Sequence, residues 1–261
     1  MSGTKIRSSF THWVNSMQLH FCIATKKNHL TKFINARAVY DYRECYNIAV
    51  NQFAPAIMNH TPNEIVELKW HYNWNEKSTT QLFYFIPLEK ILSHWKQPRT
   101  IRFELLKAIR DNRCVVLANC FVVWKETTPY CVYVQDQRLF AFGAIWKETA
   151  LHTGFALLTQ PANELLLRIG QKNMPLILKE REIRDWLNKD CSSSRITCLM
   201  RTTYPGTKMN AYPIGPEIND LNNNHRFIYT PTGERLNPEL DYGVKERLVR
   251  QGWGRSKQDE E

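Results

Sequence analysis

The sequence predicts a domain of mixed strands and helices that is built on an antiparallel meander. Three apolar runs, rich in Val, Ile, Phe and Tyr, follow one another closely at residues 114–124, 130–134 and 139–146. The polar connectors between them have the length of hairpin loops, and the first contains Pro129, which cannot donate a hydrogen bond to a central strand. We therefore expect each run to pair with the next at the centre of the fold.

A series of shorter elements is predicted before the meander. Leu30, Phe33 and Ile34 recur with helical spacing, and Asn28 is a candidate cap for that helix. Alternation of apolar and polar residues predicts the strands. We expect strands at 19–24, 46–49, 53–58 and 64–74, and helices at 28–38, 87–95 and 104–110.

Further elements are predicted after the meander. Asn163 precedes an apolar run with helical spacing and is able to cap it. Beyond residue 188 the chain is rich in Ser and Thr, so we expect it to loosen there without a further helix. The predicted strands are 155–159, 174–178 and 212–215, and the predicted helices are 162–169 and 180–187.

The two ends of the chain are expected to be extensions of a single core. A chain of 261 residues with a mixed fold is short enough to form one domain. Residues 1–18 are mostly polar and carry Lys5 and Arg7, which indicates a basic N-terminal extension. Residues 222–261 alternate Pro, Gly, Asn and charges, so we expect them to wrap over the core or to remain mobile.

The net charge of +10 is the most informative bulk property of the chain. Such a charge attracts polyanions and makes nucleic acid the leading class of partner, although a solubilising surface would have the same sign. No apolar run approaches the roughly 20 residues that span a bilayer, and the N-terminal residues lack the apolar segment of a secretory signal. We expect no membrane association.

Cysteine and histidine usage argues against a disulfide framework or a metal site. The seven cysteines are scattered without a C-x-x-C pair, which is typical of reduced thiols in a cytoplasmic protein. The histidines show no metal-ligand spacing on one predicted element, and no glycine-rich phosphate loop is present. We expect neither a metal nor a cofactor.

Cations and flat rings gather at the end of the strand predicted at 64–74. Lys69, Trp70, His71, Tyr72 and Trp74 form the mixture that single-stranded nucleic-acid sites use for backbone charge and base stacking. The alternative is a strand end that buries its tryptophans in the core, and for any single ring this alternative is the more common one.

Several phrases along the chain resemble those of the SRAP family, the SOS response-associated peptidases and abasic-site-processing proteins. The family's strand that ends in Glu-Trp-Lys is similar to residues 113–125, RCVVLANCFVVWK, and its Thr-x-x-Ala-Asn phrase is similar to 159–163. Further similar phrases lie at 46–49, 140–146, 173–178 and 212–219. The resemblance implies one α+β domain at 19–221, in which a curved, barrel-like antiparallel or mixed sheet is flanked by a few helices.

The same resemblance implies binding of single-stranded DNA and a covalent link to the aldehyde of an abasic site in the DNA damage response. That chemistry needs a cysteine with a free α-amine, because amine and thiol together close a thiazolidine ring. Cys22 aligns with this cysteine but lies inside the chain, while Val123 and Gly170 stand where the family has a glutamate and a histidine. We therefore expect the covalent reaction to be weakened or lost, as in a pseudoenzyme.

Candidate DNA contacts follow partly from the resemblance and partly from charge. Arg102 matches the family's DNA-contacting arginine. The others rest on residue type and predicted position, and they are Lys69, Trp70, Trp74, Arg110, Arg113 and Lys125.

Two hypotheses from different classes remain open at this point. The first is a monomeric DNA-binding domain without covalent chemistry. The second is a scaffold for protein interaction, which would use the C-terminal extension as its docking segment. A mature chain that began at Cys22 would restore the missing amine and would favour the covalent reaction.

Overall fold

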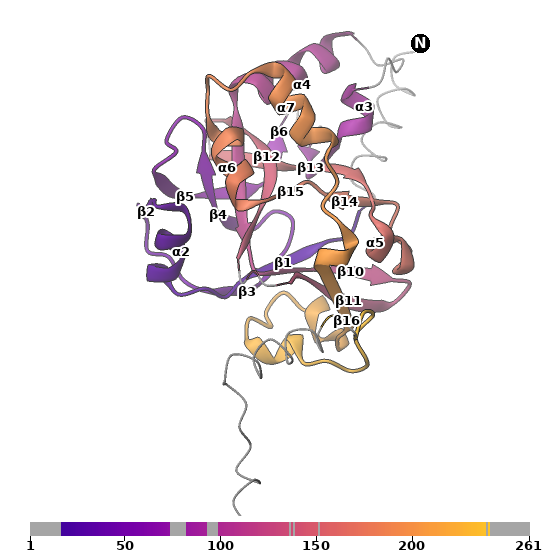
Figure 1. Cartoon of the computed structure of the whole chain (residues 1–261). Helices are drawn as coiled ribbons and strands as arrows, with labels where there is room; N and C mark the ends of the chain where they lie inside the picture. The colour runs from indigo at the N-terminus through magenta and orange to yellow at the C-terminus, as the bar shows by residue number, and fades with distance from the viewer. Residues whose placement is uncertain are drawn as a thin grey trace, which may run out of the picture.

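The computed structural model describes residues 17–73, 82–92, 99–135, 137, 139–150, 152–238 and 240. Within this part of the chain, two sheets pack on a shared core, and helices lie at one end and along the sides (Figure 1). The fold is α+β, as predicted. No helix in the described part of the chain is both long and apolar enough to span a bilayer.

The smaller sheet has five strands. They are β1 (His20–Ile23), β3 (Cys45–Ile48), β10 (Cys120–Lys125), β11 (Thr128–Val134) and β16 (Met209–Pro213). Their order is β16-β11-β10-β1-β3, and all neighbours are antiparallel.

The larger sheet has nine strands. They are β2 (Arg37–Ala38), β4 (Phe53–Met58), β5 (Glu64–Trp70), β8 (Phe85–Pro87), β9 (Arg113–Ala118), β12 (Phe140–Glu148), β13 (Thr153–Pro161), β14 (Asn173–Pro175) and β15 (Ile177–Leu178). Its main path is β14-β13-β12-β9-β4-β5-β2. A separate pair is formed by β6 (Tyr72–Asn73) and β7 (Leu82–Phe83).

The larger sheet curves until its two sides meet. A short parallel pairing joins β13 to β5, with Gly154 opposite Lys69 and Phe155 opposite Trp70. Glycine is required at 154 because a Cβ atom there would overlap the carbonyl oxygen of His71. The pairing covers only two residues of each strand, so the sheet is curved but does not close into a regular barrel.

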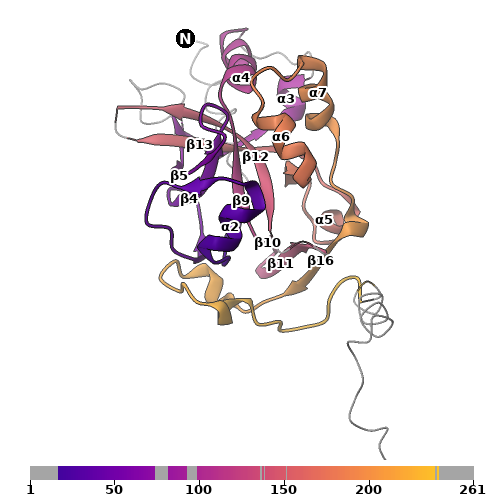
Figure 2. The same cartoon turned by 60° about the vertical axis from the view of Figure 1, so that its left-hand side comes forward.

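Helices gather at the end of the molecule away from the smaller sheet, as both views show (Figures 1 and 2). They are α2 (Lys27–Ile34), α3 (Leu88–Leu92), α4 (Arg99–Asp111), α5 (Glu164–Arg168), α6 (Glu180–Leu187) and α7 (Ser193–Arg201), of which α3, α4 and α7 form that end and α2 and α5 lie along the sides. Three 3-10 turns complete the fold, namely η1 (Gly206–Lys208), η2 (Pro216–Asn219) and η3 (Arg226–Tyr229).

The predicted meander is wrong, although two of its strands do form a hairpin. The first apolar run contains two strands, β9 in the larger sheet and β10 in the smaller one, and the chain changes sheet at Asn119. Only β10 and β11 pair as expected, since β12 pairs with β9 instead of β11. The Asn119 side chain accepts a hydrogen bond from Ala24 N at 2.6 Å and donates one to Thr25 Oγ1 at 2.8 Å. These bonds replace ladder bonds at the corner between the sheets.

Helix predictions were right in most places and wrong in two. Asn163 caps α5 as predicted, because its Oδ1 accepts a hydrogen bond from Leu166 N at 3.0 Å. The first helix stops at Ile34 and not at 38, since Asn35 takes a left-handed conformation with φ of 56° and the next residues join β2. The sequence analysis missed α7, which begins after the cap Ser192.

A second, small core lies on the outer face of the smaller sheet. It is covered by residues 214–229, which we call the covering segment and which run below that sheet in both views (Figures 1 and 2). Ile218 and Ile228 pack into this core, and Tyr229 donates a hydrogen bond to Tyr46 O at 2.7 Å. The beginning of the predicted C-terminal extension thus wraps over the core, and the residues after 240 lie outside the described part.

Candidate functional site

Cys22 and Val123 lie on neighbouring strands but point to opposite faces of the smaller sheet. In the pairing of β1 with β10, Phe21 is opposite Phe121 and Cys22 is opposite Cys120. Side chains alternate along a strand, so Val123 shares the inner face with Phe121, while Cys22 shares the outer face with Cys120. The structure does not bring together the two positions that the resemblance assigned to one site.

The Cys22 sulfur is enclosed in the small core. It lies 3.3 Å from Cys120 Sγ, and the covering segment lies over both. Hydrogen bonds with Cys131 and Cys22, together with burial, raise the pKa of the Cys120 thiol well above its usual value. Within the described residues, no group of three or more His, Cys, Asp or Glu side chains could hold a metal ion. This sulfur cluster is therefore shielded from a bulky aldehyde substrate.

Position 123 is part of the main hydrophobic core. Val123 has no exposed surface, and its partner on β11 is Tyr130. When the register of β1 and β10 is continued by one residue, Leu19 lies beside Val123. Leu19 is buried in the same core. An apolar contact thus occupies the place where the resemblance implies a carboxylate.

The loop after α5 reaches the smaller sheet through a residue that the sequence analysis did not single out. Gly170 adopts φ of 85° and offers no side chain to this region. The next residue, Gln171, donates from Nε2 to Trp124 O at 2.7 Å. No pattern marks Gln171 in the sequence, because its role depends on a contact between segments that are 47 residues apart.

The residues just before Cys22 are integral to the fold. Leu19 and Phe21 are buried in the main core. His20 Nδ1 lies 2.8 Å from Asn47 Oδ1, and burial lowers the pKa of this imidazole. A chain that began at Cys22 would lack half of β1 and the core contacts of Leu19 and Phe21.

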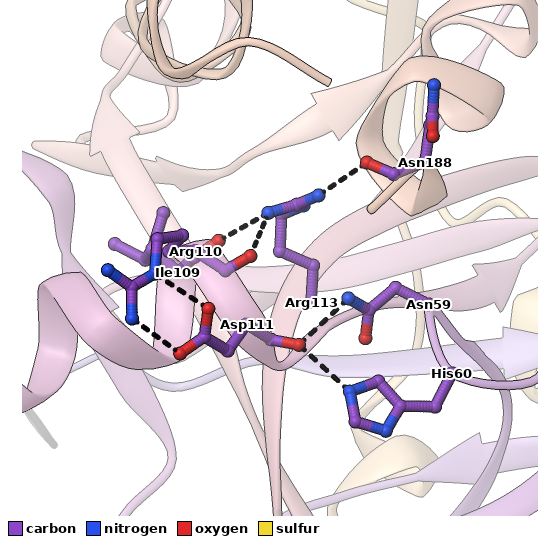
Figure 3. Close-up of polar contacts among 7 residues, drawn as sticks. All are labelled: Asn59, His60, Ile109, Arg110, Asp111, Arg113 and Asn188. Carbon is purple, nitrogen blue, oxygen red and sulfur yellow. Dashed lines mark hydrogen bonds and ion pairs between the residues drawn. The ribbon is translucent and has the colours of Figure 1, made fainter. Parts of the chain in front are cut away.

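Two of the predicted DNA contacts are buried, and for them the prediction is wrong. Trp70 has no exposed surface, donates from Nε1 to Tyr84 O at 2.9 Å and stacks near Phe155. Arg113 is 1% exposed, and its guanidinium donates to the carbonyl oxygens of Ile109, Arg110 and Asn188 (Figure 3). It also donates to Trp186 O. Neither side chain is available to a DNA strand.

The other predicted contacts are placed as follows. Arg110 is exposed on α4, where its Nε lies 2.7 Å from Asp111 Oδ1, and Lys125 is exposed at the end of β10. Arg102 lies in α4, while Trp74 lies outside the described residues. Arg110 and Lys125 therefore lie on different elements, α4 and β10, of the described part of the chain.

Lys69 lies near the rings of Phe53, His71 and His152. These rings, and not the buried Trp70, are its aromatic neighbours. Phe53 is directly opposite Lys69 across β4 and β5, and Lys69 Nζ lies 6.0 Å from the centre of that ring. The imidazoles of His71 and His152 meet edge to face with centres 5.0 Å apart. Burial lowers the pKa of both histidines, and the charge of Lys69 lowers it further.

A comparison with family models decides which family this architecture represents. The model described as SOS response associated peptidase (SRAP) matches residues 17–221. The chain belongs to the SRAP family. The residues that this match covers include the strand pair β1–β10, the loop after α5 and the cross-strand pair of Phe53 and Lys69.

Relatives of the SRAP domain were found in bacteria and in a phage. The abasic site processing protein YoaM of Bacillus subtilis (strain 168) is 24% identical over 195 residues, which are 70% of this chain and 83% of that protein. The abasic site processing protein YoqW of Bacillus phage SPbeta is 24% identical over 197 residues, which are 70% of this chain and 84% of that protein.

Solved structures share the SRAP fold. A crystal structure of a protein from Bacteroides thetaiotaomicron superimposes with a TM-score of 0.69 at 20% identity, over 82% of this chain and 99% of that chain. A phage-related protein from Bordetella bronchiseptica has a TM-score of 0.59 at 18% identity, over 75% of this chain and 93% of that chain. The likeness covers most of this chain and shows that the fold is shared.

Proposed function

We propose that this SRAP domain binds single-stranded DNA without forming a covalent link to an abasic site. The observation that carries the proposal is the division of Cys22 and Val123 between two faces of one sheet, each enclosed in a hydrophobic core. A thiol within a continuous β-strand lacks the free amine that ring closure requires. The scaffold retains the family's architecture, while this region lacks the groups that bond to a sugar aldehyde.

DNA as the partner is supported by charge and by relatives. The net charge of +10 favours association with polyanions. YoaM and YoqW are both named for the processing of abasic sites, a lesion of DNA. We infer a non-covalent role in the DNA damage response, as a monomer in the cytoplasm.

Two measurements on the full chain test the proposal. Fluorescence anisotropy with a labelled oligothymidine is expected to show binding whose association constant falls steeply with salt, by a slope of about 0.7 per phosphate contact. The same chain, incubated with an oligonucleotide that carries an abasic site, is expected to give no shifted band on a denaturing gel. The absence of binding at low salt would refute DNA as the partner. A shifted band that disappears in Cys22→Ala would show that the enclosed sulfur reacts.

A protein-interaction role is the second candidate, and the covering segment favours it. Phe227 is 65% exposed on this segment, with the guanidinium of Arg226 at 4.9 Å from its ring. The segment is held by hydrogen bonds, for example from Tyr46 N to Asn224 Oδ1 at 2.6 Å. An exposed ring on a held backbone is a common anchor in protein interfaces. Loss of a co-purified partner in Phe227→Glu, with DNA affinity unchanged, would support this role.

A further inference from the structure

Four adjacent strands present one row of residues at the end of the larger sheet. The register of these strands places Lys147 opposite Gly154, Gly154 opposite Lys69, and Lys69 opposite Phe53. Partners in a ladder point to the same face, so the three side chains of this row share one side of the sheet. Gly154 has no side chain, and the carbonyl oxygen of His71 occupies the place where its Cβ atom would lie. The exposed Phe53 ring and the side chains of Lys69 and Lys147 therefore lie on one side of the sheet, next to the His71 backbone.

Lys69 and Phe53 are available to a ligand. Phe53 is 48% exposed, although it lies in a strand whose next four residues are buried or nearly so. Among the described residues, Lys69 makes no ion pair, and its ammonium group lies 6.0 Å from the Phe53 ring centre. One nucleotide is long enough to place its base on that ring and its phosphate at that ammonium group.

Two imidazoles border the same surface. His71 is two residues after Lys69 on the chain, and His152 is two residues before Gly154. His71 Nδ1 lies 3.3 Å from Asn51 Oδ1, and its ring contacts that of His152 edge to face. His152 Nε2 is buried and has no hydrogen-bond partner in the described part of the chain. A phosphate oxygen that reached this nitrogen would give it an acceptor that the described residues do not supply.

We propose that Phe53, Lys69, His71 and His152 form a subsite for one nucleotide of a single DNA strand. The base stacks on Phe53, and the phosphodiester lies between the Lys69 ammonium group and the two imidazoles. The subsite rests on the proposed function, since it assumes that the strand is DNA. Stacking on a ring and contact with the backbone are independent of base identity, so the subsite accepts any base.

Binding at this subsite strengthens as the pH falls. Both imidazoles are uncharged at neutral pH, because burial and Lys69 hold their pKa values below the usual value of 6.5. A bound phosphate favours the protonated imidazoles and raises their pKa. The groups that face them or flank them are Asn51, Glu67, Lys69, Tyr84, Lys147 and Glu148. Of these, Glu67 lies on the same face of β5 and opposes an anion.

The experiment measures the affinity of the full chain for a labelled oligothymidine by anisotropy. Phe53→Ala is expected to weaken binding roughly tenfold, which is the scale of one stacked base. Lys69→Gln is expected to weaken binding and to reduce the salt slope by about 0.7. Glu67→Gln is expected to strengthen binding. Phe227→Ala and Arg226→Gln remove a matched exposed ring and cation from the covering segment and are expected to change nothing.

A second set of measurements determines the affinity for the same oligonucleotide between pH 7.5 and 5.5. Wild type is expected to bind more tightly at the lower pH, and the double variant His71→Gln/His152→Gln is expected to lose most of this dependence. The subsite is refuted, and the proposed function stands, if wild type binds while the Phe53 and Lys69 variants match it. Both are refuted if wild type does not bind at low salt.

Discussion

Replacing Arg113 by alanine is expected to lower the free energy of unfolding by about 3–5 kcal/mol, the usual range for breaking a buried charged network. The guanidinium donates to Ile109 O and Trp186 O at 2.9 and 2.6 Å, and to two further carbonyl oxygens. These oxygens lie at the ends of α4 and α6, where helix carbonyls lack partners and a positive charge is favoured. Alanine would take this donor from the buried carbonyls of Ile109 and Trp186, while Asn188 O would keep its bond from Cys191 N.

Arg110 provides the matched control for this substitution. It lies three residues earlier, in the last turn of α4, but it is exposed and, among the described residues, pairs with Asp111. Arg110→Ala is expected to leave the urea midpoint nearly unchanged, because exposed ion pairs contribute little to stability. Urea unfolding followed by fluorescence distinguishes the two, provided that the m-value is constant. Equal midpoints for Arg113→Ala and wild type would mean that the carbonyls find other donors.

Arg113 also shows why a prediction from charge alone assigned a buried residue to the candidate DNA surface. An arginine at the start of a strand is usually exposed, and the nearest carboxylate in the sequence, Asp111, pairs with Arg110 instead. Its acceptors are backbone carbonyls, two of them on α6 more than 70 residues away along the chain. The sequence does not indicate which backbone carbonyls will accept hydrogen bonds from a distant side chain. The same holds for Trp70, whose partner is the carbonyl of Tyr84.

The fold could be predicted where the signal is local. Asn163 marks the start of α5 because a cap acts on the next three residues, and β10 and β11 form a hairpin because a short turn joins them. The strand change at Asn119 could not be found in this way. The apolar run continues through it, and the hydrogen bonds at this corner join Asn119 to Ala24 and Thr25, which follow β1.

The sequence carries a signal for the missed helix α7, but a run of serines at its start also fits a loop. Ile196, Leu199 and Met200 repeat with helical spacing and are buried. Ser192 accepts a hydrogen bond from Arg195 N at 3.2 Å, which is the geometry of a helix cap. A run of serines is common in loops as well as at helix starts, so the serines favoured the prediction of a loop here.

The candidate site depended on which side of a strand each residue faces. The resemblance assigned Cys22 and Val123 to one family site, and it predicted that the amine, the carboxylate and the histidine of that site have no counterpart in this sequence. It did not indicate that Leu19, rather than Cys22, lies beside Val123. A change of register by one residue turns a side chain to the other face, and only the pairing of β1 with β10 decides the register.

Val123→Glu is the second substitution with a large expected effect, because it restores the residue type that the resemblance assigns to this position. The new carboxylate would lie in the main hydrophobic core, beside Leu19 and opposite Tyr130. Burial of an unpaired carboxylate is expected to cost about 3–5 kcal/mol of unfolding free energy at pH 7.5. Lys125→Glu on the exposed end of the same strand is the control and is expected to have little effect.

The pH dependence of Val123→Glu identifies the cause of its instability. Burial raises the pKa of the glutamate in the folded state above the unfolded value of about 4.3, so the folded state holds its proton more tightly. The loss of stability relative to wild type is therefore smallest below about pH 4.3 and grows as the pH rises through the folded pKa. Val123→Gln is expected to be destabilised without this dependence. A Val123→Glu protein as stable as wild type at pH 7.5 would mean that position 123 opens to water, which would contradict its place in the main core.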